Sequence, residues 1–181
     1  MMTGQSSSGS KAVRAAVVLA MHGAPPKDFP RHELAEWFQL HGRAERADVE
    51  ERAALKQREA QLEARMRAWP RTGENDPFYV SSMAMAVELS QAAGLPVVVG
   101  FNEFCAPSLE EAMRQAIDDG AQKVVVITPM LTPGGEHAEH DIPATIERVQ
   151  SAHPDVAIVY AWPFKMEDVA RFLAARVVQE L

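Results

Sequence analysis

The sequence predicts a single α/β domain built on an open, four-stranded parallel sheet flanked by helices. Four apolar runs of strand length, rich in β-branched residues, span residues 15–21, 96–101, 123–131 and 156–162. Each run is almost continuously apolar, which is typical of strands that are buried on both faces of a sheet. Helical patterns separate the runs, and this alternation favours right-handed crossovers. The chain has 181 residues, of which 47% are hydrophobic, and this is enough for one buried core.

The start of the chain contains two different segments. Residues 1–10, MMTGQSSSGS, are small and polar, so we expect a flexible tail and a domain that begins at residue 11. The following run, KAVRAAVVLAMHG, has the basic start and short apolar stretch of a signal peptide. No small-residue cleavage site follows it, and we therefore interpret it as the first strand.

The gap between the first two predicted strands is too long for one crossover helix. It predicts a charged helical insertion over about residues 30–72, and then a second helix over residues 78–93. One interpretation of the insertion is a solvated helix or helical hairpin packed by a narrow stripe; the other is a lid or a dimer contact. The stripe would consist of four apolar residues: Leu55, Leu62, Met66 and Trp69.

Three helices are predicted in the second half of the chain. Ser108 and Glu111 match a capping box, and Gly120 is placed to end the helix that they begin. Asp141 is expected to cap the next helix. The segment 167–181 predicts a last helix with an apolar face. That face would consist of Val169, Phe172, Leu173, Val177 and Leu181.

Charge and cysteine content restrict the function classes. The formal charge of -7 disfavours nucleic acid as a partner, because duplex binding needs a cationic surface, but it is compatible with a cationic or metallic ligand. No apolar run approaches the roughly 20 residues of a membrane helix. The single cysteine, Cys105, excludes an internal disulfide and suits a reducing cytoplasm, where we expect the protein to be located.

Polar side chains follow three of the predicted strands. His22 and Gly23 end the first strand, Glu103 follows the second, and His137 follows the third. Ligands of open parallel sheets bind beyond the carboxyl ends of the strands, so these side chains should converge. Imidazole and carboxylate groups suit a borderline divalent ion held in an open site. Gly23 lacks a Cβ atom and would permit a close approach.

Each of these residues also has a purely structural interpretation. His22 could be a hydrogen-bonded turn residue, and Glu103, between two phenylalanines, could form a simple salt bridge. His137 and His140 have the spacing of half a structural zinc site. No cysteine cluster and no second histidine pair accompany them, so a closed structural zinc site is not expected.

Several other chemistries lack their motifs. No G-x-G-x-x-G or P-loop pattern follows a strand, which leaves nucleotide binding unsupported. Ser81 and Ser82 lie in a helical pattern without a nucleophile elbow, and the nearby Glu103 disfavours a reactive thiolate at Cys105. The run SSMAMAVELS is interpreted as core packing. Phosphohistidine chemistry of the mutase type needs an arginine before the His-Gly pair, where this chain has Met21.

The arrangement of these motifs resembles a known family. A strand that ends in HG, a strand followed by an acid and a helix-opening proline, and a third strand followed by GxHxxxDIP are similar to the short sirohydrochlorin chelatases. These are class II, CbiX-type enzymes related to the ferrochelatases. The matched stretches are residues 15–23, 97–117 and 123–162. The resemblance implies a single flavodoxin-like lobe, a homodimer and ATP-independent insertion of cobalt, iron or nickel into a tetrapyrrole such as sirohydrochlorin.

The resemblance also implies roles for individual residues. His22 and His137 would bind the metal, which is a substrate and not a prosthetic group, and would accept pyrrole protons with help from Glu103. His140 stands where relatives have an acid or polar residue, and it is a further candidate metal ligand. Residues 30–72 lie outside the family pattern and could cover the tetrapyrrole or change the dimer. Candidates for substrate binding are Gly23, Lys27, Arg31, Gly134, Gly135, Trp162 and Lys165.

A non-catalytic protein with the same cleft is the alternative. Such a binding module would store or deliver a metal ion or a tetrapyrrole without turnover. Repeated release of product would separate the enzyme from the binding module.

Overall fold

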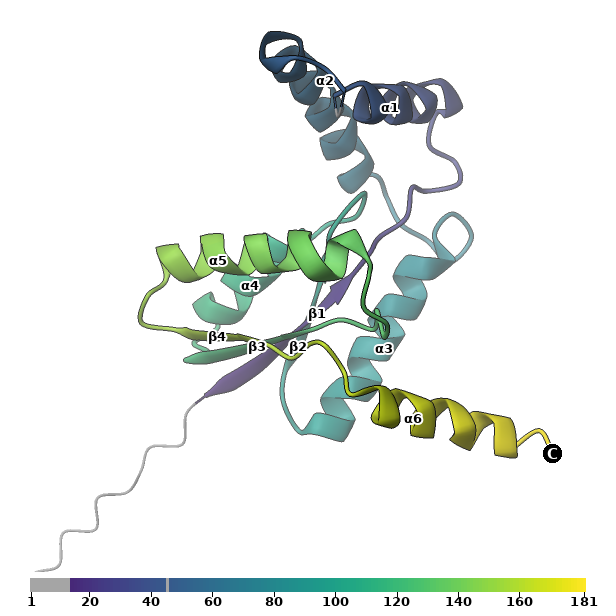
Figure 1. Ribbon diagram of the computed structural model, residues 1–181, viewed down its shortest axis with the longest axis vertical. Coiled ribbons are helices and arrows are strands. Elements are labelled where there is room, and N and C mark those ends of the chain that lie inside the picture. The colour runs from purple at the N-terminus through teal and green to yellow at the C-terminus, as the bar shows by residue number, and fades with distance from the viewer. Residues whose placement is uncertain (1–13, 45) are drawn as a thin grey trace, which may run out of the picture.

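The computed structural model describes residues 14–44 and 46–181, so the predicted flexible tail at residues 1–10 lies outside the described residues. Four parallel strands form one sheet in the order β2-β1-β3-β4, as the sequence predicts (Figure 1). The strands are β1 (Ala15–Met21), β2 (Val97–Phe101), β3 (Lys123–Ile127) and β4 (Ala157–Tyr160).

Six α-helices and one π-helical turn connect or follow these strands in the described part of the chain. None of the described helices is long and apolar enough to cross a membrane. Their bounds are α1 (Arg31–Ala44), α2 (Val49–Arg67), α3 (Pro77–Ala93), α4 (Leu109–Asp118), η1 (His137–Asp141), α5 (Ile142–Ala152) and α6 (Met166–Val178).

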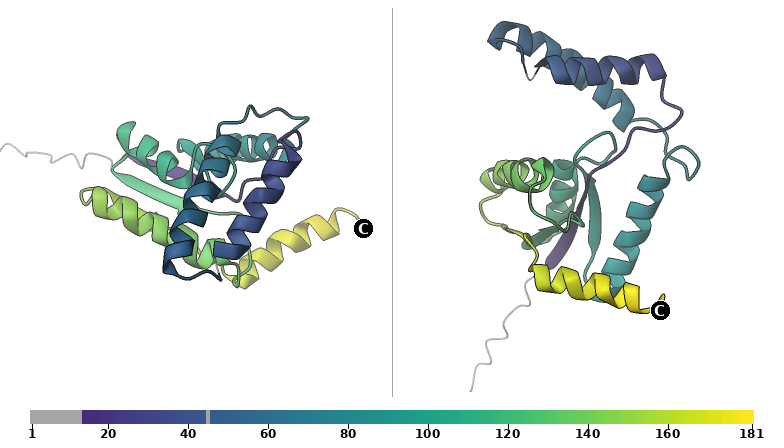
Figure 2. Two further views of the ribbon diagram at one scale, coloured as in Figure 1. Left: turned by 90° about the horizontal axis from the view of Figure 1, so that it is seen from above. Right: turned by 45° about the vertical axis from the view of Figure 1, so that its right-hand side comes forward.

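Helices cover the two faces of the sheet unequally. In the right-hand view of Figure 2, α4 and α5 lie on one side of the sheet and α3 lies on the other. The larger core lies under α4 and α5, where Val18, Met113 and Ile142 are fully buried. The second core lies between α3 and the strands β1 and β2, around Leu19 and Phe101. Strands β3 and β4 receive no such cover from α3.

The predicted insertion forms a helical hairpin, α1 and α2, beyond the edge of the sheet to which the strands point (Figure 1). The predicted stripe packs inward: Leu55, Leu62 and Met66 are buried, and Trp69 packs against the same cluster. That cluster also contains Trp37 of α1 and Phe104 of the β2–α4 loop. The hairpin is therefore anchored on the loop that carries Glu103.

Most predicted helix signals are confirmed, and one is wrong. The Ser108–Glu111 capping box starts α4 in the reciprocal geometry that its sequence predicts. Asp141, by contrast, has helical backbone angles and makes no capping hydrogen bond. The π-turn η1 precedes α5 without a break, and the Asp141 carboxylate interacts with His137 instead. The third strand also ends at Ile127 and not at residue 131, because a proline-containing turn follows it.

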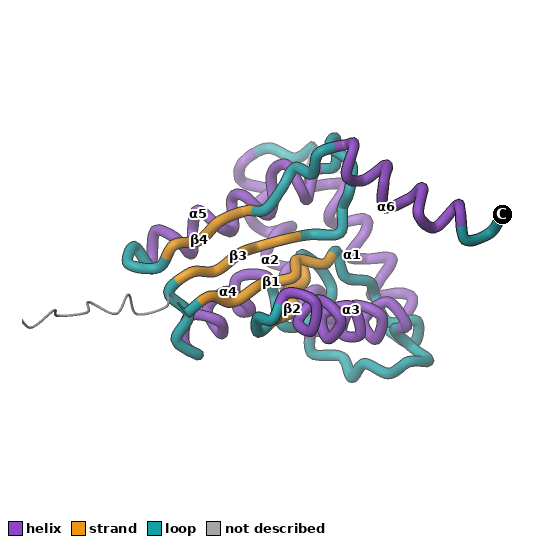
Figure 3. Tube along the Cα trace, turned by 90° about the horizontal axis from the view of Figure 1, so that it is seen from below, coloured by secondary structure: helices purple, strands orange, loops and turns teal. Residues whose placement is uncertain are grey.

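The last helix has the predicted apolar face but buries little of it. Figure 3 shows α6 extending away from the sheet, and within the described residues it packs along no other helix or strand. Val169 is buried, whereas Phe172 and Leu173 are 67% and 52% exposed. The interpretation of the methionine run in α3 as core packing is confirmed only in part: Ala86 is buried and Leu89 packs against the second core, whereas Met83 and Met85 are 41% and 43% exposed.

Candidate metal centre

The His22–Gly23 pair lies where the ends of β1 and β2 meet. The backbone N–H of Glu103 donates to the carbonyl of His22 at 2.9 Å, so the two strand-end loops are joined at this point. Gly23 has a φ of +95°, and a Cβ atom built there would lie 1.9 Å from the Glu103 carbonyl oxygen. Only glycine fits this approach, which explains physically why a histidine at this strand end is followed by glycine.

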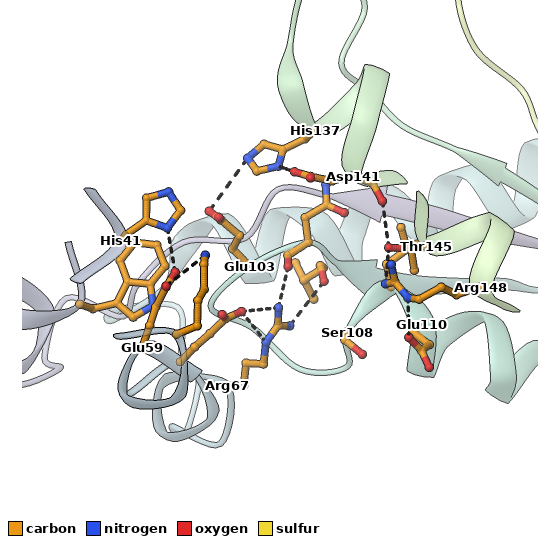
Figure 4. A pocket seen from close by; sticks show the side chains of 16 residues that line it. His41, Glu59, Arg67, Glu103, Ser108, Glu110, His137, Asp141, Thr145 and Arg148 are labelled. Atoms are coloured by element: carbon orange, nitrogen blue, oxygen red, sulfur yellow. Dashed lines mark hydrogen bonds and ion pairs between the residues drawn. The ribbon is translucent and has the colours of Figure 1, made fainter. Parts of the chain in front are cut away.

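His137 is oriented by a carboxylate on its own turn of helix. Residues 137–141 form a single π-turn, which places His137 and Asp141 on the same side. The Nδ1 atom of His137 lies 2.6 Å from Oδ2 of Asp141 (Figure 4). Because a carboxylate only accepts hydrogen bonds, Nδ1 carries the proton and Nε2 is left with a lone pair. Carboxylates commonly hold metal-binding histidines in this way.

The three predicted ligands converge. The structure brings together one ligand atom each from His22, Glu103 and His137, all within 4.8 Å of one another. The two imidazole rings meet edge to face, with centroids 4.4 Å apart and an interplanar angle of 90°. Nε2 of His137 lies 4.0 Å from Oε2 of Glu103. The Nδ1 atom of His22 lies 2.9 Å from the Gly23 carbonyl, which leaves its Nε2 as an acceptor.

Two nitrogens and one carboxylate oxygen form a donor set that suits a borderline divalent ion such as Co²⁺, Ni²⁺ or Fe²⁺. Three protein ligands leave coordination positions open, as in catalytic and not in structural metal sites. His137 and Glu103 are about one-fifth exposed, and His22 is exposed, so the centre can be reached from outside. The group can therefore bind an ion without enclosing it.

The structure does not bring the other candidate ligand to the centre. His140 is exposed and is absent from the only cluster of candidate metal ligands among the described residues. It follows His137 by three positions on a turn with π geometry, so its side chain has a different direction.

Two cavities adjoin at the candidate metal centre, between the hairpin and the edge of the sheet. Their volumes are about 380 and 620 Å³. Glu103, His137 and Asp141 line both cavities from the sheet side, and His22 lines the larger one. The opposite wall belongs to the hairpin and includes Trp37. The insertion thus forms one wall of both cavities at the centre.

The basic residues expected at the cleft lie elsewhere. Lys27 lines a separate shallow pocket beside Asn75. Arg31 is exposed at the start of α1, Lys165 precedes α6, and neither lines either cavity at the centre. The sequence analysis expected these three residues at the mouth of the cleft because they follow strand ends closely in the sequence. In the structure the loops after the strands place them away from both cavities.

The remaining substrate-binding candidates have structural partners. Gly23 joins the loops as described. The Gly134 N–H donates to Glu139 at 2.8 Å, and Gly135 accepts from the backbone of the same residue. The indole of Trp162 donates to the Met130 carbonyl at 2.9 Å. Neither these two glycines nor Trp162 lines the two cavities.

The hairpin supplies polar residues that the sequence analysis missed. Glu59 is 6% exposed and lies 2.8 Å from His41 and 3.2 Å from Lys56. All three residues line the smaller cavity. The sequence contained a signal for this burial. Position 59 lies on the same side of the helix as Leu55 and Leu62 of the apolar stripe, so the spacing predicts that Glu59 is buried as well.

Ion pairs balance most of the cationic groups in the cavity walls. Lys56 pairs with Glu59, Arg67 with Glu63 at 2.6 Å, and Arg148 with Glu110 at 3.5 Å (Figure 4). Glu103 and Asp141 have no lysine or arginine partner among the described ion pairs and face His137 instead. The side of the cavity nearest to the centre is therefore electronegative, which favours a cation there.

Comparisons with known proteins identify related chains. The family model described as CbiX matches residues 71–180, which is more than half of the chain. A sirohydrochlorin cobaltochelatase of Priestia megaterium is 32% identical over 106 residues, which are 59% of this chain and 33% of that protein. A sirohydrochlorin cobaltochelatase of Sulfurisphaera tokodaii is 33% identical over 86 residues, or 47% of this chain and 68% of that one.

The coverage of these relatives differs. The chain spans about a quarter to a third of the length of the first relatives, including a sirohydrochlorin ferrochelatase of Priestia megaterium that is 33% identical over 70 residues. Among solved structures, a CbiX protein from Marinobacter aquaeolei VT8 has a TM-score of 0.50 at 18% identity, with 92% of this chain and 95% of that chain covered. This likeness supports the fold.

Proposed function

The chain belongs to the CbiX family, and on that premise we propose that it inserts a divalent metal ion into a tetrapyrrole without ATP. Sirohydrochlorin, named in the relatives, is the proposed tetrapyrrole, and cobalt, iron or nickel is the proposed metal. The observation that carries the proposal is the convergence of His22, Glu103 and His137 at an open cavity. The metal ion is a substrate, and no prosthetic group is invoked.

The first task of such a centre is to hold the ion without trapping it. Nε2 of His22 and Nε2 of His137 offer lone pairs, and the Glu103 carboxylate adds one negative charge. The Gly23 carbonyl and the Asp141 carboxylate hold the Nδ1 atoms of His22 and His137, on the side of each ring away from the free Nε2 atom. The two imidazole rings are therefore already oriented before an ion binds. Three ligands and a partly open site allow the ion to leave for the macrocycle.

The second task is to remove two pyrrole protons. Imidazole and carboxylate side chains accept protons near neutral pH, and both kinds face the same cavity here. His137 is backed by Asp141, which stabilises the imidazolium that forms when Nε2 accepts a proton. Glu103, 4.0 Å from that nitrogen, is placed to accept or relay the other proton.

The substrate would lie between the hairpin and the sheet edge. Trp37 and Phe38 offer aromatic surface on the hairpin side of the larger cavity. A polycarboxylate also needs cationic partners, and Lys56 and Arg148 now replace the basic residues expected from the sequence. Both side chains are more than half exposed, at 52% and 60%. Exposed ion pairs are weak, so Arg148 can be shared with a substrate carboxylate at little cost, whereas Lys56 also balances the buried Glu59.

The proposal also covers assembly and location. The resemblance implies that two copies pair, and the described part of this chain forms one lobe. A cytoplasmic location is proposed from the single buried cysteine, Cys105, which needs no oxidising compartment.

The test is the rate of metal insertion, followed by the absorbance change of the tetrapyrrole. Sirohydrochlorin and protoporphyrin would each be combined with Co²⁺, Fe²⁺ and Ni²⁺. We expect His137→Ala to lower the rate more than ~100-fold, because it removes a metal ligand that also accepts a proton. His140→Ala, a histidine of the same segment outside the centre, is the matched control and should change the rate little.

Two results would contradict the proposal. An unchanged rate for His137→Ala would remove this residue from the centre, and equal damage from His140→Ala would mean that the primary ligand was chosen wrongly. If the wild-type protein converts no more than one equivalent of tetrapyrrole with any metal, the non-catalytic binding module is the better description.

A further inference from the structure

The hairpin carries a second pair of a histidine and a carboxylate. The Nδ1 atom of His41 in α1 lies 2.8 Å from Oε1 of Glu59 in α2. His137 and Asp141 form the same kind of pair, with 2.6 Å between Nδ1 and Oδ2. Both histidines line the two cavities at the centre, His41 from the hairpin side and His137 from the sheet side. Each side of these cavities therefore presents an imidazole that is held by a carboxylate.

Glu59 determines how His41 can act. Glu59 is buried, whereas the side chain of His41 is 39% exposed. Because a carboxylate only accepts hydrogen bonds, Nδ1 of His41 carries the proton, and a neutral ring accepts at Nε2. The negative charge of Glu59 stabilises the imidazolium that forms when Nε2 takes up a proton. The pair thus has the composition of a general base with its orienting carboxylate.

Aromatic packing fixes His41 relative to the metal centre. The ring of Trp37 stacks on His41, with centroids 5.0 Å apart and an interplanar angle of 15°. Trp37 is buried and also contacts Phe104, with centroids 4.9 Å apart. Phe104 directly follows Glu103 of the centre. In Figure 4 the Glu103 carboxylate lies between the rings of His41 and His137.

Metal insertion gains from a proton acceptor that does not bind the metal. While His22, Glu103 and His137 hold the ion, their lone pairs are used for coordination, and the charge of the ion disfavours a proton beside it. A flat macrocycle between the two walls turns one face to the centre and the other to the hairpin. A proton that leaves on the hairpin side moves away from the incoming ion, and His41 lies on that side.

We propose that His41 is a further catalytic residue, which accepts one pyrrole proton on the hairpin side while the metal ion enters from the centre. The inference rests on the proposed function. The pyrrole N–H bond breaks, its electron pair forms the bond from nitrogen to metal, and the proton passes to Nε2 of His41 and then to water. The second proton goes to the centre. Glu59 is a positioning residue that acts through His41.

The role belongs to this chain and not to the region that it shares with the family. The match to the CbiX model begins at residue 71, whereas both members of the pair lie on the hairpin, before that point. The proposal therefore gives the insertion a part in the reaction, beyond its place as a wall of the cavities.

Insertion of Co²⁺ into sirohydrochlorin by His41→Ala and His41→Gln tests the role of His41. We expect kcat to fall roughly 100-fold in both variants, with the KM for the tetrapyrrole unchanged. The affinity for Co²⁺ in calorimetry should also stay the same, because the metal ligands are intact. Imidazole in the buffer should restore part of the kcat of His41→Ala only, since only alanine leaves space for it. His32→Gln changes an exposed histidine of the same helix and should leave kcat unchanged.

A double variant separates positioning from packing. Glu59→Gln should lower kcat less than His41→Gln does, because the imidazole remains. The two substitutions together should lower kcat no further than His41→Gln alone, since Glu59 acts through the ring. A packing defect would instead add to the loss in the double variant and lower its urea midpoint, and that result would contradict the positioning role.

Three other results would overturn the proposal. A His41→Ala protein with the wild-type kcat would remove His41 from the reaction and leave the proposed chelatase function intact. A loss of activity with weaker Co²⁺ binding and no rescue by imidazole would give His41 a structural role only. A wild-type protein that inserts no metal would remove the proposed function, and the role of His41 with it.

Discussion

Arg71 offers the sharpest test of how the hairpin and the sheet are joined. Its guanidinium contacts four segments at once: the Ala24 carbonyl at 2.8 Å, the Met66 carbonyl at 2.8 Å, the Phe104 carbonyl and the Asp76 carboxylate at 2.6 Å. Ala24 follows the His22–Gly23 pair, and Phe104 follows Glu103. One side chain thus links the loops that carry two of the three residues of the centre.

The cost of removing this group can be worked out from its burial. The side chains of Arg71 and Asp76 are 6% and 1% exposed. Removing one partner of a buried pair costs roughly 3–5 kcal/mol, because the remaining charge stays uncompensated. Domains of this kind are stable by about 5–15 kcal/mol, so Arg71→Ala should lose a large part of that stability. With a urea slope of about 2 kcal/mol/M, the unfolding midpoint falls by roughly 2 M.

Arg71→Lys separates stability from positioning. Lysine keeps the charge opposite Asp76 but cannot reach several carbonyls with a planar fork. We expect a smaller fall in the urea midpoint than for alanine, together with weaker binding of Co²⁺ measured by calorimetry. Arg58→Ala, which removes an exposed pair with Glu36, is the control and should change neither quantity noticeably. If Arg71→Ala unfolds at the wild-type urea concentration, the guanidinium does not hold these loops together.

Three further predictions concern the local features that shape the site. Gly23→Ala should lower the urea midpoint and abolish Co²⁺ binding, because its Cβ atom would meet the Glu103 carbonyl; full Co²⁺ binding in calorimetry would contradict this. The backbone N–H and hydroxyl of Ser108 lower the pKa of Glu111 from its ordinary 4.5, so the capping box stabilises the fold above that pH and loses its contribution as the pH falls through the lowered pKa. Glu111→Gln should therefore make the melting temperature depend less on pH in the acidic range. An unchanged pH dependence in that range would show that the Glu111 carboxylate does not stabilise the fold in this way. Burial raises the pKa of the Cys105 thiol, so iodoacetamide should label the unfolded chain but hardly label the native one at pH 8, and rapid native labelling would disagree.

The sheet and much of the candidate metal centre could be predicted, because both depend largely on where the apolar strands end. Each strand is an uninterrupted apolar run, and parallel strands bring their carboxyl ends to one edge. His22 and Glu103 follow such ends almost directly, whereas His137 lies beyond the loop after Ile127, where the GxHxxxDIP motif of the resemblance singled it out. Lys27 and Arg31 sit further along their loops, where the direction of the chain depends on contacts that a local pattern does not contain.

The capping role of Asp141 failed for a related reason. An aspartate before a helical pattern and a proline is a strong helix-start signal, but the signal assumes that its carboxylate has no better partner. In this chain His137 is four positions earlier, and the π-turn brings its Nδ1 atom within 2.6 Å. The same residue cannot serve the helix start and the imidazole, and the contact with the ring is the one that is formed.

The hairpin could be predicted as helical, whereas the sequence left open whether it covers the site or is only a solvated structure. Its apolar stripe identified which side faces inward, yet the partner surface is a loop far away in sequence. Arg67 reaches the Asn102 and Cys105 carbonyls at 2.6 and 2.5 Å, and Arg71 reaches two further loop carbonyls. Buried carbonyls that lack secondary-structure partners need donors, and these arginines supply them.

The link between hairpin and sheet would also constrain how the proposed macrocycle enters. Arg67 and Arg71 fix the base of the hairpin to the loop that carries Glu103, so the hairpin cannot swing away from the sheet at that end without breaking buried hydrogen bonds. The opposite end of the hairpin, where α2 begins at Val49, has no comparable anchor to the sheet among the described contacts. A flat substrate is therefore expected to enter from the side of Phe38 and His22, where the larger cavity opens, and to meet the three ligands with its edge first.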